Sequence, residues 1–326
     1  MVRMRVIAFV TGGSGYVGRN LIRALVARGD EVRALARSER ARAGVAALGA
    51  TPVAGDLDDT GAMTAAAHGA GCVFHAAAQV DLTGTRADFE RVTVHGTEHV
   101  IAAARAAGVP RLLHVGTEAV LADGKPIVDA DETRPRAARP AGLYPWSKGL
   151  AEERVVAASG TGGLETVVIR PRFIWGRDDT SVLPNMVATI RAGRFAWIAG
   201  GRYPTSTCHI ANVVEGALLA ADKGAPGGIY FLTDGEPVEL RGFVTEMLAT
   251  QGVDPGKKQV PRWIARAAAA VTGNWKRPIV TRTEVALFGV QVTVDDRKAR
   301  RELGYTGAMT RAAGLAEMRA APPIAG

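Results

Sequence analysis

Cysteines and long apolar runs are scarce in this sequence, and each scarcity excludes a class of protein. The 326 residues include only two cysteines, Cys72 and Cys208, which are too few for a disulfide framework. We therefore expect a reducing, cytoplasmic location. No apolar run reaches the roughly 18 residues that a membrane-spanning helix requires. Stable membrane insertion is therefore not expected.

Concentrated positive charge is also missing, although the net charge is +8. The basic residues are scattered, and no basic patch is interleaved with aromatic residues, so a nucleic-acid partner is not expected. Some of the excess positive charge would suit a pocket for a polyanionic cofactor. The Ala-rich segment RWIARAAAAVTGNW at residues 262–275 could touch a membrane surface as a helix, but its shortness favours a packed surface helix.

Short apolar strands and helical segments alternate through the first half of the chain. Strand-like runs rich in Val and Ala occur at residues 5–10, 31–36, 51–56, 71–77, 111–117 and 164–170. Helical patterns lie between most of them, including a long one at 86–107. This alternation predicts right-handed crossovers and an α/β Rossmann fold, with a doubly wound parallel sheet covered on both faces.

After residue 170 the pattern loosens, and the length of the chain favours a second, smaller lobe. We expect residues 1–170 to form an NADP-binding Rossmann domain, to which 207–233 return. Residues 171–206 and 234–326 would form a substrate-binding lobe. Short helices are expected there at 240–251, 261–271 and 296–303.

A glycine-rich loop, VTGGSGYVG, follows the first strand and opens the first helix. Gly12 would allow a tight turn, Gly15 the approach of a pyrophosphate, and Gly18 close packing of helix on strand. The helix N-terminus, with Tyr16 and Val17, would then face the anion. The strand before the loop and the helix after it favour a dinucleotide site over a turn without ligand.

The end of the second strand indicates which dinucleotide binds. NAD sites usually carry an acidic residue there, but this chain has Ala36, Arg37 and Ser38. Arg37 can stack on adenine and pair with a 2′-phosphate, which favours NADP(H). NAD(H) remains an alternative, in which Arg37 is a surface residue and Glu39 takes the acidic role.

A tyrosine and a lysine, Tyr144 and Lys148, stand four residues apart at the start of a predicted helix. Residues at this spacing share one helix face, and Pro145 suits the first turn. A phenol is a poor acid/base at neutral pH unless its pKa falls, and a nearby ammonium would lower it. The pair therefore predicts a tuned acid/base.

Taken in order, several motifs resemble those of the extended short-chain dehydrogenase/reductases over essentially the whole chain. These are the glycine loop, GDLDD at 55–59, HAAAQVD at 75–81, YPWSK at 144–148 and VIRPRFIWG at 168–176. The stretches GTEAV and STCHIANV are most similar to the 3-beta-hydroxysteroid dehydrogenase-like branch. The resemblance implies further cofactor-binding residues, namely Asp56, Leu57, Ala76, Ala77, Ala78 and Pro171.

The resemblance also implies the catalytic roles. Tyr144 would protonate a carbonyl oxygen as hydride arrives, Thr117 would hydrogen-bond that oxygen, and Lys148 would also hold the nicotinamide ribose. The chain departs from the family pattern on the long helix, where Thr93 and His99 replace two usual asparagines. This departure puts in doubt any structural or proton-relay role that the family's asparagine has on this helix.

The substrate is expected to be a hydrophobic ketone or secondary alcohol, steroid-like or bulky. Phe173 stands where sugar-nucleotide enzymes place an Asn, and Thr205 where they place an Arg. Apolar Phe173 and Trp175 would instead contact a greasy substrate. A nucleotide-sugar epimerase or dehydratase is the alternative, kept open by Glu118 beside Thr117 and by Arg172 and Arg202. A cofactor-sensing regulator without turnover is a third interpretation.

Other reactive side chains suggest no separate site. His95 and His99 lie one turn apart, but no third ligand is close in sequence, so no metal is expected. Cys72 opens an apolar strand and is expected in the core, and Cys208 lacks the context of a nucleophile. The sequence leaves a homodimer open.

Overall fold

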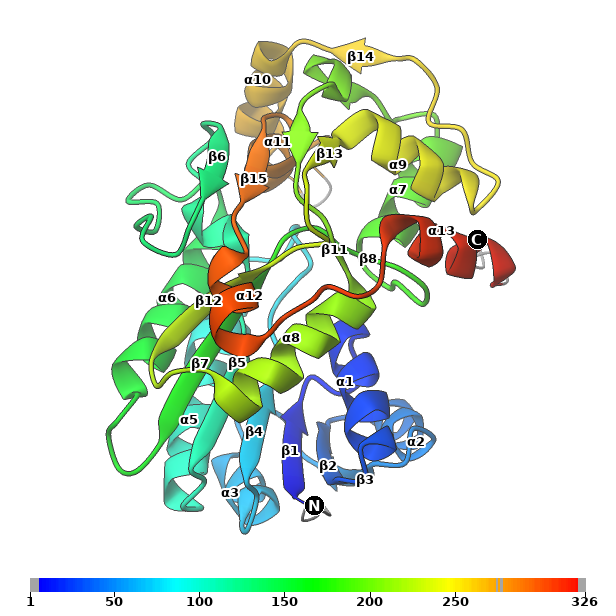
Figure 1. The fold of residues 1–326 in the computed structure, drawn as a ribbon. Coiled ribbons are helices and arrows are strands. Elements are labelled where there is room, and N and C mark those ends of the chain that lie inside the picture. The colour runs from blue at the N-terminus through cyan, green and yellow to red at the C-terminus, as the bar shows by residue number, and fades with distance from the viewer. Residues whose placement is uncertain (1–5, 274, 276–277, 322–326) are drawn as a thin grey trace.

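The computed structural model describes residues 6–273, 275 and 278–321, and a seven-stranded sheet lies at its centre (Figure 1). All neighbouring strands of this sheet pair in parallel. In spatial order they are β12 (Gly228–Leu232), β7 (Glu165–Pro171), β5 (Arg111–Val115), β4 (Cys72–His75), β1 (Ile7–Thr11), β2 (Glu31–Ala36) and β3 (Thr51–Ala54). The chain builds outward from β1 in both directions, which leaves a crevice at the carboxyl ends of β1 and β4.

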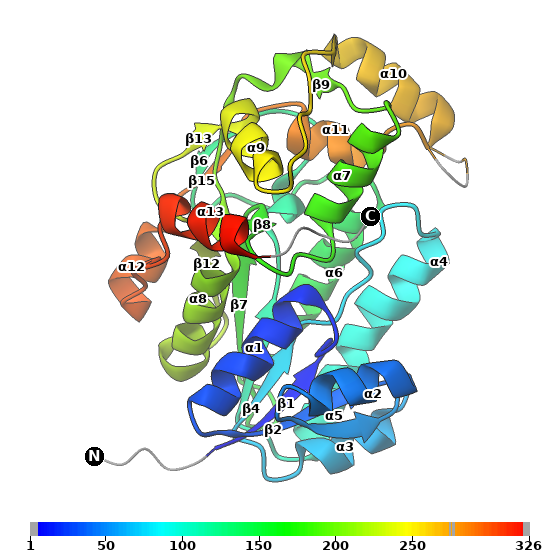
Figure 2. The same ribbon diagram turned by 90° about the vertical axis from the view of Figure 1, so that its right-hand side faces the viewer.

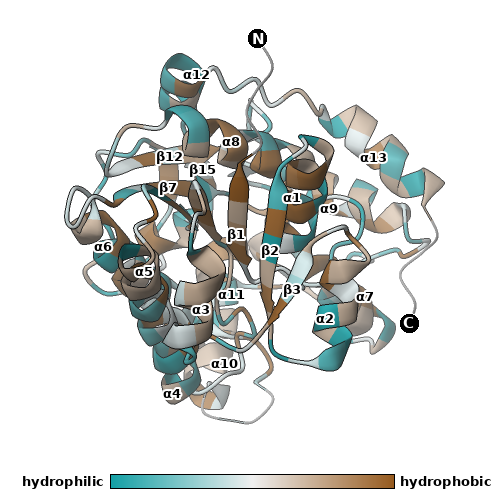
Figure 3. Cartoon of the chain, turned by 90° about the horizontal axis from the view of Figure 1, so that it is seen from below, coloured by the Kyte–Doolittle hydropathy of each residue, from teal (hydrophilic) through white to brown (hydrophobic). Residues whose placement is uncertain are grey.

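Helices cover both faces of the sheet, so the predicted doubly wound fold is confirmed (Figure 3). One face carries α1 (Tyr16–Ala27), α2 (Glu39–Ala46), α8 (Ile210–Lys223) and α12 (Arg297–Leu303). The other face carries α3 (Thr60–Ala67), α5 (Gly96–Ala106) and α6 (Leu143–Ala158). The strands are apolar on both sides because each side is buried under a helical layer.

The long helix predicted at 86–107 is interrupted. It consists of α4 (Arg86–Phe89), a π-helical turn η1 (Glu90–His95) and α5. Thr85 caps α4 in a capping box with Asp88. Single π turns of this kind often occur at functional sites, and this one holds Thr93, which contacts a loop of the site described below.

A second group of elements stands above the carboxyl ends of the large sheet (Figures 1 and 2). Its mixed sheet has the order β13 (Val238–Glu239), β10 (Pro204–Thr205), β15 (Val292–Val294) and β6 (Ile127–Ala130). Two further pairs are β8 (Ile174–Trp175) with β11 (Cys208–His209) and β9 (Trp197–Ile198) with β14 (Gln259–Val260). Short 3₁₀ turns are η2 (Glu118–Leu121) and η3 (Ala199–Gly201).

The helices of this group are α7 (Val182–Arg191), α9 (Leu240–Ala249), α10 (Arg262–Thr272), α11 (Arg282–Phe288) and α13 (Arg311–Ala320). The helices expected at 240–251, 261–271 and 296–303 are present as α9, α10 and α12, whereas α11 and α13 were not expected. The proposed boundaries of the two lobes stay a prediction. One strand from the segment 207–233, β12, does join the large sheet.

Helix α10 packs through small side chains and leaves large ones outside. Ala265, Ala269 and Thr272 are buried, while Trp263 and Val271 are each 70% exposed. No helix in the described part of the chain is long and apolar enough to span a membrane. Both cysteines are buried and unpaired, which confirms the core position expected for Cys72.

Candidate active site

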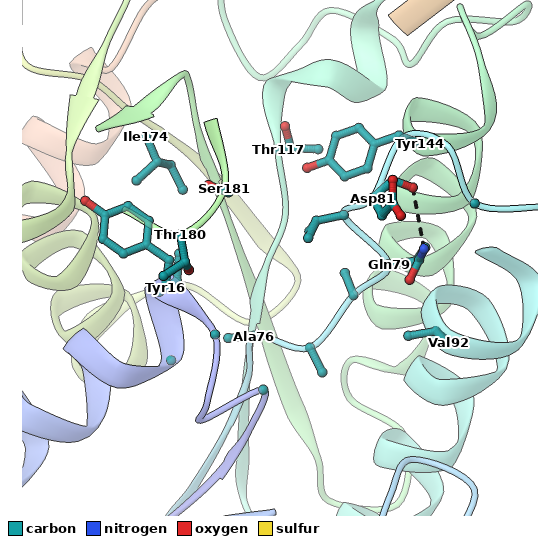
Figure 4. Close-up of a pocket in the computed structure, with 18 of the residues that line it drawn as sticks. Tyr16, Ala76, Gln79, Asp81, Val92, Thr117, Tyr144, Ile174, Thr180 and Ser181 are labelled. Carbon is teal, nitrogen blue, oxygen red and sulfur yellow. Dashed lines mark hydrogen bonds between the residues drawn. The ribbon is translucent and has the colours of Figure 1, made fainter. Parts of the chain in front are cut away.

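A cavity of about 780 Å³ lies where the carboxyl ends of the large sheet meet the second group of elements. Figure 4 shows side chains converging on it from both sides. Of the residues predicted to form the site, all but Lys148 and Trp175 line this cavity. They are Gly12, Gly15, Tyr16, Val17, Gly18, Arg37, Asp56, Leu57, Ala76, Ala77, Ala78, Thr117, Tyr144, Pro171 and Phe173.

The glycine loop is shaped by contacts that leave no room for side chains. Gly12 has φ +73°, and a Cβ there would lie 2.6 Å from the Ala77 nitrogen. A Cβ on Gly18 would lie 2.1 Å from the Gly12 oxygen. Gly15 is the N-cap of α1, and no described side chain caps that end. The first N–H groups of α1 are therefore available to an anion in the cavity, so the loop fits a dinucleotide diphosphate.

The end of β2 presents Arg37 and not Glu39 to the cavity. Arg37 is exposed and lines the cavity wall. Ser38 caps α2 by accepting the Ala41 N–H, and Glu39 pairs with Arg42 on the next turn. Because this acidic side chain is held along its own helix, the charged group that this strand end presents to the cavity is a cation.

Thr93 and His99, which replace the usual asparagines, support the loops that line the cavity. The Thr93 hydroxyl accepts the Gln79 N–H at 3.0 Å, and His99 Nδ1 contacts the Leu57 carbonyl oxygen at 2.8 Å. Each contact ties the π turn or α5 to a loop at the carboxyl end of a strand. These two positions therefore have a structural role in this chain.

Tyr144 and Thr117 face one another across a corner of the cavity (Figure 4). Tyr144 lies in the first turn of α6, and Thr117 follows β5 as the N-cap of η2. Burial and the negative charge of Glu118, partly offset by a hydrogen bond with Thr117, raise the pKa of Tyr144 to about 12. The phenol therefore carries its proton at neutral pH.

The predicted lowering of the Tyr144 pKa is wrong for the chain itself, because Lys148 is engaged elsewhere. Its Nζ donates to the Val115 carbonyl oxygen at 2.7 Å and lies 3.4 Å from His114 Nε2. Lys148 is buried behind the cavity wall, and this burial lowers its own pKa to about 8. The desolvation of Tyr144 therefore raises its pKa more than the positive charge of Lys148, on which the sequence-based prediction rested, lowers it.

A buried ion pair borders the same corner, and its geometry was not predicted. Arg172 Nη1 donates to Glu118 Oε1 at 2.9 Å, and the Thr117 hydroxyl donates to Glu118 Oε2 at 2.9 Å. Arg172 Nη2 also donates to the Leu287 carbonyl oxygen at 2.7 Å. Both charged side chains line the cavity. The only sequence signals were the adjacency of Glu118 to Thr117 and an arginine in RPRF.

The two aromatic residues predicted to contact substrate lie in different places. Phe173 lines the cavity, with φ +43°, and packs edge-to-face on Phe243 and Phe288. Trp175 is fully buried, and its indole N–H donates to Asp234 at 2.7 Å. The structure does not bring Trp175 to the cavity, because side chains alternate along β8 and Trp175 points into the core.

Tyr16 lies on the cavity wall opposite Tyr144, beside Ile174 (Figure 4). Its hydroxyl is buried and has no hydrogen-bond partner among the described residues. Burial raises the pKa of this phenol, as do the nearby Asp179 and Asp178. A buried donor of this kind is expected to meet a polar group of a bound molecule.

The two histidines considered as metal ligands have other partners. His95 Nδ1 lies 3.0 Å from Glu98, and His99 contacts Leu57 as described above. Within the described residues, no group of three or more His, Cys, Asp or Glu side chains could hold a metal ion.

Comparison with known proteins agrees with this geometry. The model of the 3-beta hydroxysteroid dehydrogenase/isomerase family matches residues 9–262. The chain belongs to this family. It is thus an NAD(P)-dependent oxidoreductase of the extended short-chain dehydrogenase/reductase type, and the resemblance seen in the sequence is confirmed.

Two curated relatives cover nearly the whole chain. The 4-hydroxy-2-methyl-3-oxo-4-farnesyl-3,4-dihydroquinoline-1-oxide ketoreductase of Stigmatella aurantiaca is 52% identical over 97% of this chain and 96% of its own length. The decarboxylating sterol-4-alpha-carboxylate 3-dehydrogenase of Dictyostelium discoideum is 31% identical over 95% and 99%.

Among solved structures, a dTDP-glucose 4,6-dehydratase from Streptomyces venezuelae, a double mutant with NAD bound, is similar in fold. It is 24% identical, with a TM-score of 0.77, over 97% of this chain and 96% of its own. At this identity the similarity concerns the fold alone.

Proposed function

We propose that this family member is an NADP(H)-dependent ketoreductase that interconverts a bulky hydrophobic ketone and its secondary alcohol. The observation that carries the proposal is the pairing of a protonated, half-buried Tyr144 with an apolar cavity wall. Phe173, Ile174, Leu287 and Phe288 supply that wall. Relatives named for a farnesylated oxo-quinoline and for a sterol support a substrate of this type.

The chain would hold the cofactor along the carboxyl ends of its central strands. The α1 N-terminus would bind the diphosphate, and Arg37 would pair with a 2′-phosphate. Ala76, Ala77 and Ala78 would allow close approach beside the glycine loop. Lys148 would hold the nicotinamide ribose, as the resemblance implies, once its Nζ turns from the Val115 carbonyl oxygen toward the cavity. When bound, this cofactor supplies or accepts a hydride.

Tyr144 would move the proton. Because its pKa is raised to about 12, the phenol is an acid in its protonated form at neutral pH, as ketone reduction requires. It would donate its proton to the substrate carbonyl oxygen, while the aromatic wall excludes water and positions the carbonyl carbon. A hydrogen bond with Thr117 would orient the phenol ring before substrate enters.

A nucleotide-sugar substrate is less compatible with the charges in the cavity. Its diphosphate needs cationic partners when buried. Arg172 is already neutralised by Glu118, and Thr205 is a buried partner of that same arginine. Arg202 is exposed and does not line the cavity. These contacts leave the cavity mouth at Phe173 without a free cation among the described residues.

The test is a panel of bulky aromatic, aliphatic and steroidal ketones, monitored by NADPH absorbance, beside UDP- and dTDP-sugars studied by calorimetry. We expect NADPH oxidation with several ketones and no binding of the sugars. Micromolar binding of a nucleotide sugar, together with no turnover of any ketone, would contradict the proposal.

A further inference from the structure

Most of the large apolar side chains that are exposed in the described part of the chain gather on α10 and the turn after it. This α10 face consists of Trp263, Ile264, Val271, Trp275 and Ile279, whose exposed fractions run from 40% for Ile264 to 74% for Ile279. Elsewhere such exposure occurs at Val80 and Val128, which stand singly. Clustered exposure of this kind marks an interaction surface on a soluble protein.

The α10 face has a fixed shape because its backbone is tied down. Helix α10 packs on α11 through small side chains, and Thr272 at its end is buried. The Trp275 N–H donates to the Thr272 carbonyl oxygen at 2.8 Å, and the Ile279 N–H donates to the Thr272 hydroxyl at 3.2 Å. These two bonds hold the turn against the end of α10, next to Val271.

The charge around the α10 face has one sign. From residue 255 to residue 283 the sequence contains no acidic residue. The described charged residues of this stretch are Lys257, Lys258, Arg262, Arg266 and Arg282. Arg266 donates to the Gly124 carbonyl oxygen, and the neighbouring Asp123 lies 3.8 Å from Lys125. Glu284, the next carboxylate along the chain, is engaged in the capping box of α11. The apolar face is therefore bordered by cations.

The α10 face lies at the outer end of the molecule but close to the cavity. Helix α10 stands at the end of the second group of elements that is remote from the large sheet (Figures 1 and 2). Helix α11 lies between this face and the cavity, and its Thr283, Leu287 and Phe288 line the cavity wall. A surface that binds the α10 face therefore comes within one helix of the cavity.

We propose that the α10 face docks on the surface of an anionic lipid bilayer. Tryptophan side chains favour the headgroup level, aliphatic side chains enter the acyl boundary, and Lys and Arg attract anionic headgroups. The helix lies in the plane of the interface, because its 11 residues are too few to cross a bilayer. This inference does not depend on the ketoreductase proposal.

The experiment is co-sedimentation of the full chain with vesicles of phosphatidylcholine alone or of phosphatidylcholine with an equal part of phosphatidylglycerol. We expect binding to the anionic vesicles that is at least about tenfold stronger than to the neutral ones, because several cations gain an anionic partner. High salt should weaken it. Tryptophan emission should shift to shorter wavelength on binding, because Trp263 and Trp275 leave water.

Two double variants at exposed positions separate the apolar and the charged contributions. Trp263→Gln with Val271→Gln should weaken binding to anionic vesicles by about tenfold and reduce the emission shift. Lys257→Gln with Lys258→Gln should weaken binding to anionic vesicles and leave the weak binding to neutral ones unchanged. Val128→Gln, at an exposed valine of β6 outside the α10 face, is the matched control and should bind as the wild type does.

Failure of the wild type to sediment with anionic vesicles would overturn the inference and leave the ketoreductase proposal intact. Equal, salt-independent binding to both kinds of vesicle would also overturn it. A dimer that Trp263→Gln dissociates, together with no vesicle binding, would show that a second copy covers this face instead. The wild-type comparison of the two vesicle types decides even if a variant does not fold.

Discussion

Tyr144 is the residue on which the proposed chemistry depends. It stands at the mouth of α6, where its side chain meets Thr117 after β5. Its pKa is raised to about 12, mainly by burial, so the phenol already carries its proton at physiological pH. It can therefore act as the acid without a prior protonation step.

Replacing Tyr144 by phenylalanine removes only the hydroxyl. We expect turnover to fall by a factor on the order of 10² to 10⁴, because the general acid is lost, while NADPH still binds. Steady-state rates and fluorescence titration of NADPH provide the measurement. Tyr230→Phe is a matched control, because the Tyr230 hydroxyl contacts Ala225 at the far end of β12. Similar turnover in Tyr144→Phe and wild type would remove the proposed role.

His75 gives the fold a defined sensitivity to acid. It is fully buried between the hydroxyls of Thr11 and Thr97, at 2.7 and 2.9 Å. Burial, assisted by the charge of Lys148, lowers its pKa from 6.5 to about 3. The unfolded chain therefore binds the proton first, so stability falls as pH drops below about 6.5 and continues to fall toward pH 3.

We expect this histidine to remove about 2 kcal/mol from the free energy of unfolding between pH 7 and pH 5. Denaturant titrations at the two pH values measure the loss. In His75→Asn, which cannot acquire the charge, the pH dependence should be smaller by that amount. An identical pH dependence in the variant and the wild type would show that His75 does not carry it.

At the residue scale, the sequence predicted identities better than contacts. Spacing singled out Tyr144 and Lys148, and the family resemblance singled out Thr117, but neither indicated that Lys148 donates to Val115. The Glu118–Arg172 pair joins residues 54 positions apart, and only the fold brings them together. The predicted direction of the Tyr144 pKa shift was wrong for the same reason, because burial cannot be deduced from a local motif.

At the scale of elements, the end of β2 determines which cofactor is preferred. Arg37 is exposed on the cavity wall there, while α2 begins at Glu39 and holds that carboxylate along the helix. A charge-assisted contact between a guanidinium and a phosphate contributes about 1.5–3 kcal/mol. We expect the wild type to prefer NADPH over NADH by the corresponding factor.

Arg37→Asp should reverse this preference, because a carboxylate repels the 2′-phosphate and accepts hydrogen bonds from ribose hydroxyls. The ratio of kcat/KM for NADPH and NADH, measured with one ketone, tests it. Arg40→Ala, at an exposed arginine of α2 that does not line the cavity, serves as the control for general loss of positive charge. Equal use of both cofactors by the wild type would refute the argument from Arg37.

Long elements with a clear periodicity were predicted, and short ones were not. Six strands of the large sheet and helices such as α1 and α6 follow from apolar runs and helical spacing. Strands of two residues, such as β8 and β11, are too short for any periodicity to be visible. The π turn η1 also escaped prediction, because it widens the helix without changing its apolar pattern.

For the whole molecule, the position of the site followed from the fold class. Parallel strands wound outward from β1 place their following loops at one edge, and the glycine loop marks where a dinucleotide binds. The opposite wall of the cavity was harder to predict, because it depends on how the second group of elements packs. Trp175 was expected there, but lies in the core beneath Phe243.

The central claim is that hydride passes between the cofactor and the carbonyl carbon of a hydrophobic ketone. Transfer of deuterium from NADPH labelled at C4 tests this most directly, with mass spectrometry and NMR of the product. The account predicts a secondary alcohol with deuterium on the carbinol carbon, formed in step with NADPH oxidation. An alcohol without deuterium on the carbinol carbon would contradict it, and so would unchanged ketones with intact NADPH across the whole panel.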